Sequence, residues 1–403
     1  MPTVTPSAPL RSPLPPTVIA LGITSFFTDL GAEMIFPLLP MFVATLGANP
    51  AFIGLVEGLA DAGASILKLA MGWAADKFAH KKPWVLFGYG LAAFVRPLVF
   101  FATAPWQVLA IRLTDRVGKG LRSTPRDVLL ANAVSPEQSG RAFGFHRAMD
   151  HAGAVVGPIV ASALLACGVP LRFVFASALV PGLCAVVAVL TVKERATARV
   201  AEKHRGTTTA GREDDAIPRS LKQYIAIICL FALGNSTDAF LLLRAHSIGI
   251  SILSLPFVWS AFHVVKVVVA YFAGSWSDRL PRHRLVVAGW VTYALVYLGF
   301  AFANQTWHIW GLFLVYGAHH GLCEPAEKAM VRDLAPGSAL GRAFGLYNFS
   351  VGIMALPAGL LTGWLWQTWG PVVALGAGAA TAGAATVALL AWGGAQRRVI
   401  SSA

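Results

Sequence analysis

The chain has 403 residues, of which 56% are hydrophobic and 13% are charged, and its formal net charge is +13. This composition excludes an ordinary soluble protein, because the mean hydropathy is positive and charged residues are about half as frequent as in soluble domains. Nucleic-acid binding is not indicated either, since the Lys and Arg residues fall in short segments between apolar spans, as they do in the inner loops of membrane proteins.

Residues 1–16 are rich in proline and lack an apolar core, which predicts a disordered tail and not a cleaved signal peptide. Twelve apolar stretches follow, each near or above the roughly 20 residues that a membrane-spanning helix needs. We predict an all-α membrane protein with twelve transmembrane helices in two pseudo-symmetric six-helix bundles. The predicted helices are 17–46, 50–75, 83–103, 105–125, 143–167, 171–192, 222–246, 251–276, 285–304, 307–326, 344–367 and 370–392.

The charged segment 193–221 separates the predicted halves 17–192 and 222–392, and a short tail, 393–403, follows. Basic residues concentrate in the linker and in the turns after the even-numbered helices of the first ten. The opposite turns carry few, chiefly Arg172 and Arg244. This asymmetry places both termini in the cytoplasm, in a multi-pass protein of the bacterial cytoplasmic (inner) membrane.

Two short motifs occur twice. The pattern G-x-x-x-D-[KR] runs from Gly72 to Lys77 and again from Gly274 to Arg279, and the segment G-R-A-F-G begins at residue 140 and again 201 residues later. Such duplication is typical of secondary transporters built from two parallel halves. The repeated residues are therefore predicted to act in gating: Gly72, Asp76, Lys77, Gly274, Asp278, Arg279, Arg141 and Arg342.

Twelve spans, a basic central loop and the duplicated G-x-x-x-D-[KR] motif resemble the major facilitator superfamily, over about residues 17–392. Gly153 to Pro158 is similar to the G-x-x-x-G-P element of its antiporters and exporters, which adds Gly157 and Pro158 to the gating residues. Ala161 departs from the pattern, where a glycine often follows. Other segments look like a bacterial branch of unassigned substrate.

The superfamily resemblance implies that the first helix of each three-helix unit lines a central cavity. The sequence independently places ionisable residues there and in the second and eighth helices, where charge in a bilayer is costly and usually functional. The candidate substrate or proton pathway residues are Asp29, Glu33, Asp61, Arg112, Asp238, His263 and Lys266. Asp29 and Asp238 are the leading candidates for proton carriers, and the alternative for each acid is a fixed salt bridge with Arg96, Arg112 or Lys266.

These features predict a proton-coupled secondary transporter of a small polar, charged or amphiphilic solute that works by alternating access, with export by antiport favoured. The alternatives are a proton-coupled importer or facilitator of an organic anion or metal chelate, and a transporter-like sensor. An enzyme is not predicted, because the chain has no H-E-x-x-H, nucleophile-elbow or Walker motif. The four cysteines lack metal-ligand spacing. We expect no cofactor or metal, no nucleic-acid partner, and a functional monomer in the lipid bilayer.

Overall fold

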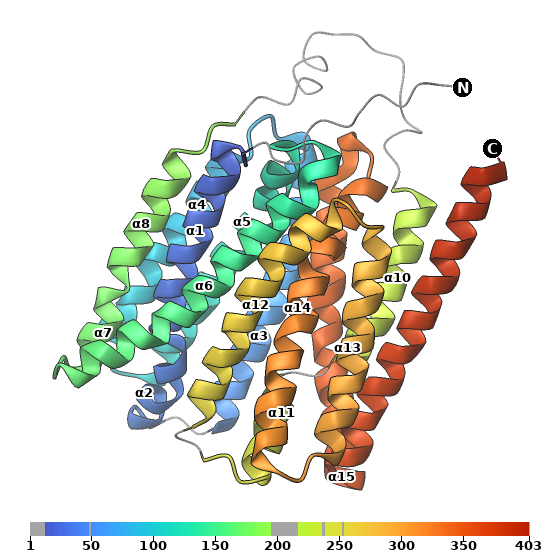
Figure 1. Ribbon diagram of the computed structural model, residues 1–403. Helices are drawn as coiled ribbons and strands as arrows, with labels where there is room; N and C mark the ends of the chain where they lie inside the picture. Colours follow the sequence, from blue (N-terminus) through green and yellow to red (C-terminus); the bar gives the residue numbers. More distant parts are fainter. Residues whose placement is uncertain (1–12, 48–49, 195–216, 236–237, 252–253, 403) are drawn as a thin grey trace.

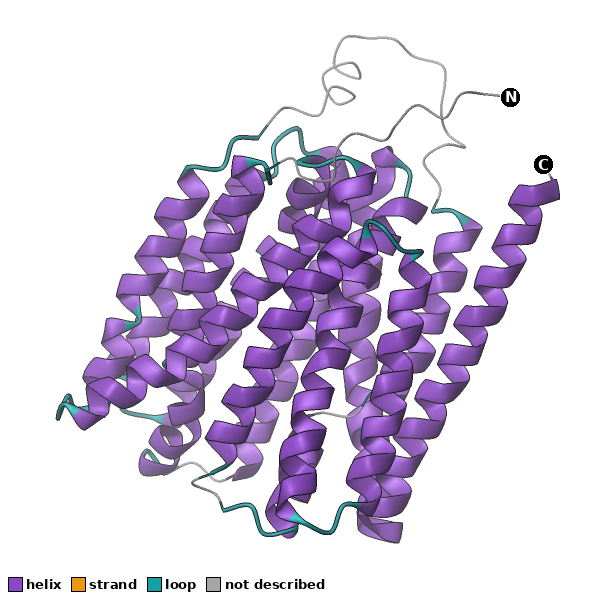
Figure 2. Ribbon diagram, viewed as in Figure 1, coloured by secondary structure: helices purple, strands orange, loops and turns teal. Residues whose placement is uncertain are grey.

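The structure is a computed structural model that describes residues 13–47, 50–194, 217–235, 238–251 and 254–402. Over these residues the chain forms helices joined by short loops, without a strand (Figure 2). Most of the predicted tail 1–16 and linker 193–221 lies outside them. The first half contains α1 (Pro16–Glu33), η1 (Phe36–Leu38), α2 (Leu39–Thr45), α3 (Pro50–Lys77), α4 (Lys82–Val95), η2 (Arg96–Phe101), α5 (Pro105–Asn132), η3 (Pro136–Gln138), α6 (Ser139–Ala166), α7 (Leu171–Ser177) and α8 (Leu179–Leu190). The second half contains α10 (Arg219–Gly234), α11 (Asp238–Ser247), α12 (Leu255–Ser277), α13 (Arg282–Phe302), α14 (Thr306–Leu334), η4 (Gly337–Ala339) and α15 (Leu340–Ser402).

Several predicted helices are interrupted, and the interruptions have local causes. The first one ends at Glu33, because Pro37 would clash with the carbonyl group of the residue four positions before it. The predicted helix 222–246 breaks at Asn235, which has non-helical dihedral angles. The last two predicted helices are the two arms of α15, and the turn between them lies at Gly370, whose φ of 83° favours glycine.

Two helices are longer than the sequence predicts. Charged residues follow Pro125, so the pattern predicts a helix end there, but α5 continues through this proline to Asn132. In the same way α14 continues through Pro325 to Leu334. The charged residues after each proline therefore lie on helices inside the bundle and not in loops.

Six stretches of the described chain are long and apolar enough to cross a membrane: Lys82–Phe101, Pro136–Ala166, Leu171–Leu190, Phe257–Ser277, Arg282–Phe302 and Gly337–Gly394. The last contains both arms of α15. The α5 helix is not among them, because it carries a row of charged residues. The fold is thus an all-helical membrane bundle, while the count of twelve spans stays a prediction.

The helices before the linker and those after it form two sides of the bundle (Figure 1). The sides meet where α6 packs against α12 and α14, and where α3 packs against α15. We call the end of the bundle where α1 begins and α15 ends the basic end, because the loops with the predicted cytoplasmic Lys and Arg residues lie there.

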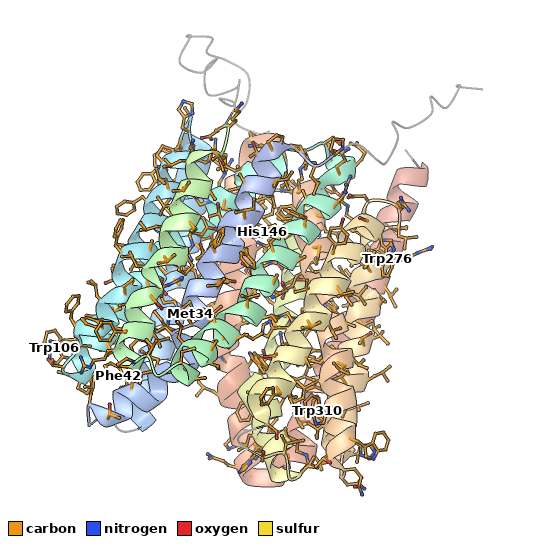
Figure 3. The ribbon with its side chains drawn as sticks, turned by 60° about the vertical axis from the view of Figure 1, so that its left-hand side comes forward. Met34, Phe42, Trp106, His146, Trp276 and Trp310 are labelled. Atoms are coloured by element: carbon orange, nitrogen blue, oxygen red, sulfur yellow. The ribbon has the colours of Figure 1, made fainter. Side chains whose placement is uncertain are left out.

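Large apolar side chains have two locations. Rings such as Trp290, Tyr293 and Phe300 are fully buried between helices of the second half. Others project outward, as Figure 3 shows for Trp106, Trp276 and Trp310, of which the first is 64% exposed. Exposed tryptophans near both ends of a helical bundle are typical of the two interfaces between a bilayer and water.

Candidate functional site

At the basic end, the carboxylate of Asp76 binds the beginning of α15. Its Oδ1 accepts a hydrogen bond from the backbone N–H of Gly341 (2.6 Å), and its Oδ2 accepts bonds from the backbone N–H (3.0 Å) and Nε (2.9 Å) of Arg342. The first N–H groups of a helix lack partners within the helix and carry partial positive charge, so a carboxylate there is favourable. We call Asp76, Gly341 and Arg342 the Asp76 lock.

The second copy of the motif makes the corresponding contact in the opposite direction. Asp278, directly after α12, accepts hydrogen bonds from the backbone N–H groups of Gly140 and Arg141 at the beginning of α6, both at 2.8 Å. We call these three residues the Asp278 lock. The two repeated motifs of the sequence therefore contact each other crosswise, and each lock joins the first half of the chain to the second.

Glycines bring the helices of each lock into backbone contact. A Cβ atom at Gly72 would lie 2.7 Å from the carbonyl oxygen of Gly341 and 2.8 Å from the Cα of Gly345. A Cβ atom at Gly274 would lie 2.6 Å from the carbonyl oxygen of Gly140. Any side chain at these positions would separate the helices, so the glycines permit the close contact between the halves at the basic end.

The other predicted gating residues lie outside these contacts. Lys77 and Arg279 follow the lock acids and are exposed. Gly157 packs on α1, where a Cβ atom would lie 2.6 Å from the carbonyl oxygen of Leu30, and Pro158 is the next residue of α6. The G-x-x-x-G-P element thus joins two helices of the same half, and its part in gating stays a prediction.

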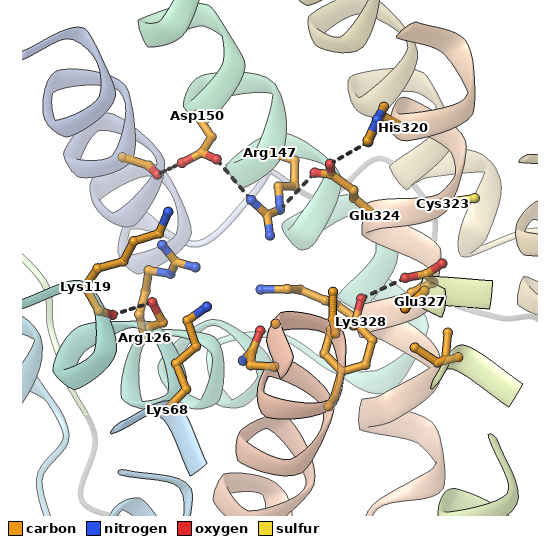
Figure 4. Close-up of a pocket in the computed structure, with 18 of the residues that line it drawn as sticks. Lys68, Lys119, Arg126, Arg147, Asp150, His320, Cys323, Glu324, Glu327 and Lys328 are labelled. Atoms are coloured by element: carbon orange, nitrogen blue, oxygen red, sulfur yellow. Dashed lines mark hydrogen bonds and ion pairs between the residues drawn. The ribbon is translucent and has the colours of Figure 1, made fainter. Parts of the chain in front are cut away.

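Between the halves lies a cavity of about 330 Å³, within the size range of small-molecule sites. Helices α1, α3, α4, α5, α6, α10, α14 and α15 all contribute to its wall. Figure 4 shows many of the polar side chains that line it. The charged ones are Asp29, Lys68, Lys119, Arg122, Arg126, Arg147, Asp150, Glu324, Glu327 and Lys328.

One ion-pair group lies beside the cavity where α5 meets α14. The Asp127 carboxylate, of which 1% is exposed, contacts Lys328 Nζ at 2.5 Å and Arg126 Nη2 at 3.1 Å. Asn348 of α15 donates a third contact at 3.2 Å. Asp127 and Lys328 are 201 residues apart, the same spacing that relates the repeated motifs. A carboxylate of the first half thus binds an ammonium group of the second half where α5 meets α14.

The same helices are joined again nearer the basic end. Arg332 of α14 donates hydrogen bonds from Nε to the carbonyl oxygen of Ala131 (3.0 Å) and from Nη2 to that of Val134 (2.7 Å). The last carbonyl groups of a helix have no partner within the helix. A guanidinium from the second half therefore caps the end of α5 in the first half.

A second ion-pair group surrounds Glu324 on α14. Its carboxylate lies 3.3 Å from Arg147 Nε, 3.3 Å from His151 Nε2, 3.2 Å from His320 Nδ1 and 3.8 Å from Lys266 Nζ. The Arg147 guanidinium is shared, because its Nη1 also contacts Asp150 at 3.0 Å. This group again crosses between the halves, since α6 supplies Arg147 and His151.

Glu327 differs from the other acids of the cavity wall. It is 92% buried, and it accepts hydrogen bonds from Trp290 Nε1 (3.2 Å) and from the Tyr347 hydroxyl (2.7 Å). Over the described residues, no Lys or Arg nitrogen lies within 4.0 Å of its carboxylate. A carboxyl held only by neutral donors can gain a proton without leaving a buried cation unpaired.

The predicted pathway residues are distributed over several places. Asp29 lines the cavity, and Lys266 contacts the cavity residue Glu324. Asp238 accepts a hydrogen bond from the Tyr316 hydroxyl at 2.7 Å. The other described members are not in the cavity wall: Glu33 lies in the last turn of α1, Arg112 contacts Asp115 at 3.7 Å, and the His263 ring packs 5.6 Å from the His151 ring. The side chain of Asp61 lies outside the described residues.

Sequence reasoning did not single out Arg126, Asp127, Glu327 or Lys328 as site residues. The signal that could have found most of them is the proline inside both α5 and α14, after which each helix carries charges at positions 201 residues apart. Within the described part of the chain, no three His, Cys, Asp or Glu side chains are close enough together to bind a metal ion.

A polar cavity enclosed by apolar helices, with ion pairs between two halves, defines a membrane transporter. The model of the Major Facilitator Superfamily matches residues 21–243 and 224–400. The chain belongs to this superfamily, which confirms the resemblance noted in the sequence.

Three similar proteins illustrate the relationship. An uncharacterized MFS-type transporter of Methanocaldococcus jannaschii is 30% identical over 358 residues, which cover 87% of this chain and 88% of that protein. The multidrug resistance protein MdtH of Salmonella newport is 24% identical over 354 residues, 86% of each chain. The crystal structure of the human organic anion transporter MFSD10 (TETRAN) matches with a TM-score of 0.75 at 15% identity, covering 95% of this chain and 100% of that one, and this likeness concerns the fold alone.

Proposed function

We propose that this chain is a proton-coupled secondary transporter that exports a small charged solute by alternating access. The halves 17–192 and 222–392 would move about the cavity, with the basic end facing the cytoplasm of a bacterium and the monomer as the working unit. In the arrangement described, the two locks join the halves at the basic end. Their opening would give the cavity access to the cytoplasm, and the chain would act in transport and not as an enzyme.

The observation that carries proton coupling is the environment of Glu327. Most acids in and beside the cavity face a Lys or Arg, so they keep their charge through those partners. Glu327 has Trp290 and Tyr347 instead, and it lines the cavity. Both its neutral and its charged form can be accommodated there, which a proton carrier requires. Asp29, the leading carrier predicted from the sequence, lines the same cavity and remains a second candidate.

Two observations favour export over uptake. The G-x-x-x-G-P element of α6 is similar to that of exporting members of the superfamily. A relative at 24% identity is a multidrug resistance protein. Neither observation identifies the solute, so one experiment has to measure the direction in which the solute moves and the movement of protons that accompanies it.

The test uses the full chain in proteoliposomes that contain a pH-sensitive dye, with charged metabolites, metal chelates and drugs as solutes. The parent protein is expected to move protons when its solute is added, opposite to the solute. Glu327→Gln is expected to abolish proton movement while solute binding survives, and Asp29→Asn tests the second candidate. Glu137→Gln, at an exposed position in η3, is the matched control.

Three outcomes would change the proposal. Proton movement in the same direction as the solute would indicate uptake by symport. Solute movement without protons in the parent would indicate a facilitator. Binding without movement under any gradient would indicate a sensor.

A further inference from the structure

The wall of the cavity has an uneven distribution of charge. Of the ten charged residues that line it, six are Lys or Arg and four are Asp or Glu. The contribution of α3 and α5 is more one-sided: it consists of Lys68, Lys119, Arg122, Ser123 and Arg126, without a carboxylate. We call the four cations of this set the basic wall. The cavity acids are on the other helices, α1, α6 and α14.

Not every cation of the basic wall is explained in the same way. Arg122 donates a hydrogen bond to the carbonyl oxygen of Gly88 (3.1 Å), and its guanidinium lies 4.5 Å from the centre of the Tyr89 ring. Its contacts are those of a side chain that joins α5 to α4. Arg126 shares the single carboxylate of Asp127 with Lys328, so two positive charges face one negative charge there.

The two lysines also line the cavity. Lys119 is in the middle of α5 and is exposed, although the residues on either side of it in the chain, Gly118 and Gly120, are buried. Lys68 lies in α3 and is half-buried. A lysine at membrane depth is costly unless it faces water or an anion. Figure 4 shows Lys68, Lys328 and Arg147 pointing into the same space, with Lys119 nearby.

We propose that the transported solute is a small organic anion with two negative charges, such as a dicarboxylate or a phosphate monoester, and that it is bound by Lys68, Lys119, Arg126 and Lys328. This inference rests on the proposed transport function, whose solute it specifies. The cavity of 330 Å³ holds the volume of about eleven waters, which suits a solute of about ten non-hydrogen atoms. A lipophilic cation would face the basic wall with the wrong sign.

The position of Asp127 connects such binding to movement. Its carboxylate holds Arg126 and Lys328 from the two halves together. An anion on Arg126 and Lys328 competes with Asp127 for these cations, and the contact between α5 and α14 weakens when it succeeds. Occupancy of the cavity by a dianion therefore favours separation of the halves, whereas a neutral solute would leave the contact intact.

The binding test measures thermal unfolding of the purified full chain with succinate, malate or glycerol 3-phosphate, each against chloride at equal ionic strength. Tetraphenylphosphonium is the cationic probe. At least one of the three anions is expected to raise Tm by several degrees, because a ligand that binds only the folded state stabilises it. Lys68→Gln and Lys119→Gln are each expected to weaken the apparent affinity by about tenfold. Lys68→Arg and Lys119→Arg are expected to retain it, which shows that the Gln variants fail through charge and not through folding.

Lys222→Gln, at an exposed position in the first turn of α10, is the matched control and is expected to bind like the parent. No Tm shift with any of the three anions overturns the proposal. An equal shift in the Gln variants overturns it as well, because the anion would then bind elsewhere as an adventitious additive only.

Transport distinguishes this inference from the proposed function. If tetraphenylphosphonium moves protons in proteoliposomes and the three anions do not, the solute class is wrong while coupled transport stands. If an anion binds through Lys68 and Lys119 and crosses the membrane without protons, the solute class stands while proton coupling is wrong.

Discussion

The Asp76 lock and the Asp278 lock come from the same duplicated motifs, but their cations differ. Both acids accept hydrogen bonds from two consecutive backbone N–H groups at the beginning of a helix in the other half. Asp76 also pairs with the Arg342 side chain across the halves. The ion-pair partner of Asp278 is Arg282 from its own half, at 3.6 Å.

Arg282 also crosses the boundary, but to neutral oxygens. Its Nη1 donates to Ser139 Oγ and its Nη2 to the carbonyl oxygen of Pro136, both at 2.6 Å, while its Nε contacts Asp333 at 2.9 Å. The comparison teaches that duplication has kept the backbone part of each lock and changed the side-chain part. The two locks should therefore respond alike to changes in the glycines and differently to changes in charge.

The largest effect is expected from the glycines, which test what the locks share. Gly72→Val and Gly274→Val place atoms within 3 Å of backbone in the facing helix, and such overpacking costs about 2 kcal/mol, a shift of roughly thirtyfold toward an open basic end. Turnover in proteoliposomes and labelling of a cysteine introduced at the basic end measure the shift. Gly90→Val, where a Cβ atom meets nothing within 4 Å, is the control, and normal turnover in both lock variants would contradict the prediction.

Removing the charge of the lock acid is expected to affect the two locks to different extents. Asp76→Asn removes an ion pair that crosses the halves, at a cost of about 2 kcal/mol, whereas Asp278→Asn is expected to cost about 1 kcal/mol. Arg342→Gln should accordingly lower turnover more than Arg141→Gln, because Arg342 bonds Asp76 through its side chain as well as its backbone, whereas Arg141 bonds Asp278 through its backbone N–H group. Solute affinity is expected to remain near that of the parent in all four variants. Equal losses at the two locks would show that the ion pair adds nothing.

A pH effect is expected from the Asp278 lock. Burial raises the pKa of Asp278 to about 6, while a carboxyl in water has a pKa of about 3.9. When the lock opens and Asp278 meets water, its pKa falls, so protonation favours the closed arrangement. The closed population should rise severalfold as the pH falls through about 6 and change little above pH 7. Cysteine labelling at the basic end between pH 4.5 and 8 measures this, and Asp278→Asn should reduce the dependence. Burial also raises the pKa of the Asp76 carboxyl, so the variant that carries both Asp278→Asn and Asp76→Asn should remove the dependence.

The smallest effect is expected at Asp333, the more exposed partner of Arg282. Its side chain is 39% exposed, and an ion pair open to water contributes about 0–1 kcal/mol. Asp333→Asn should change turnover by less than about threefold, because Arg282 keeps its contacts with Ser139 and Pro136. A loss as large as that of Asp278→Asn would mean that Asp333 holds Arg282 in place for the lock.

Much of the fold follows from the sequence, because apolar length and repeated motifs are local signals. The sequence shows the duplicated glycines and acids, but it does not show their partners, because these are backbone N–H groups about 140 and 265 residues away. Every residue except proline has a backbone N–H group, so the sequence does not indicate which of them an acid will bind. The superfamily could be identified for the same reason that the locks could, through residues repeated at fixed spacing.

The charged interior was harder to predict. Asp29 was singled out and lines the cavity, but Arg126 was not singled out, because the predicted helix 105–125 ends before it. In fact α5 continues, and its last turns bring Asp127 into contact with Lys328 of α14. Whether an intramembrane charge faces a cavity depends on how its helix is rotated and how it crosses its neighbours. Neither the rotation nor the crossing can be read from a short stretch of sequence.

The cap that Arg332 places on α5 has a consequence for how the protein folds during its synthesis. The carbonyl groups of Ala131 and Val134 are made early in translation, while the guanidinium that binds them is made about two hundred residues later. Until the ribosome has delivered α14, the end of α5 has only water or lipid headgroups as partners. The first half should therefore mature in the membrane only after the second has been inserted, and a chain truncated at the linker should be a substrate for the cell's membrane proteases.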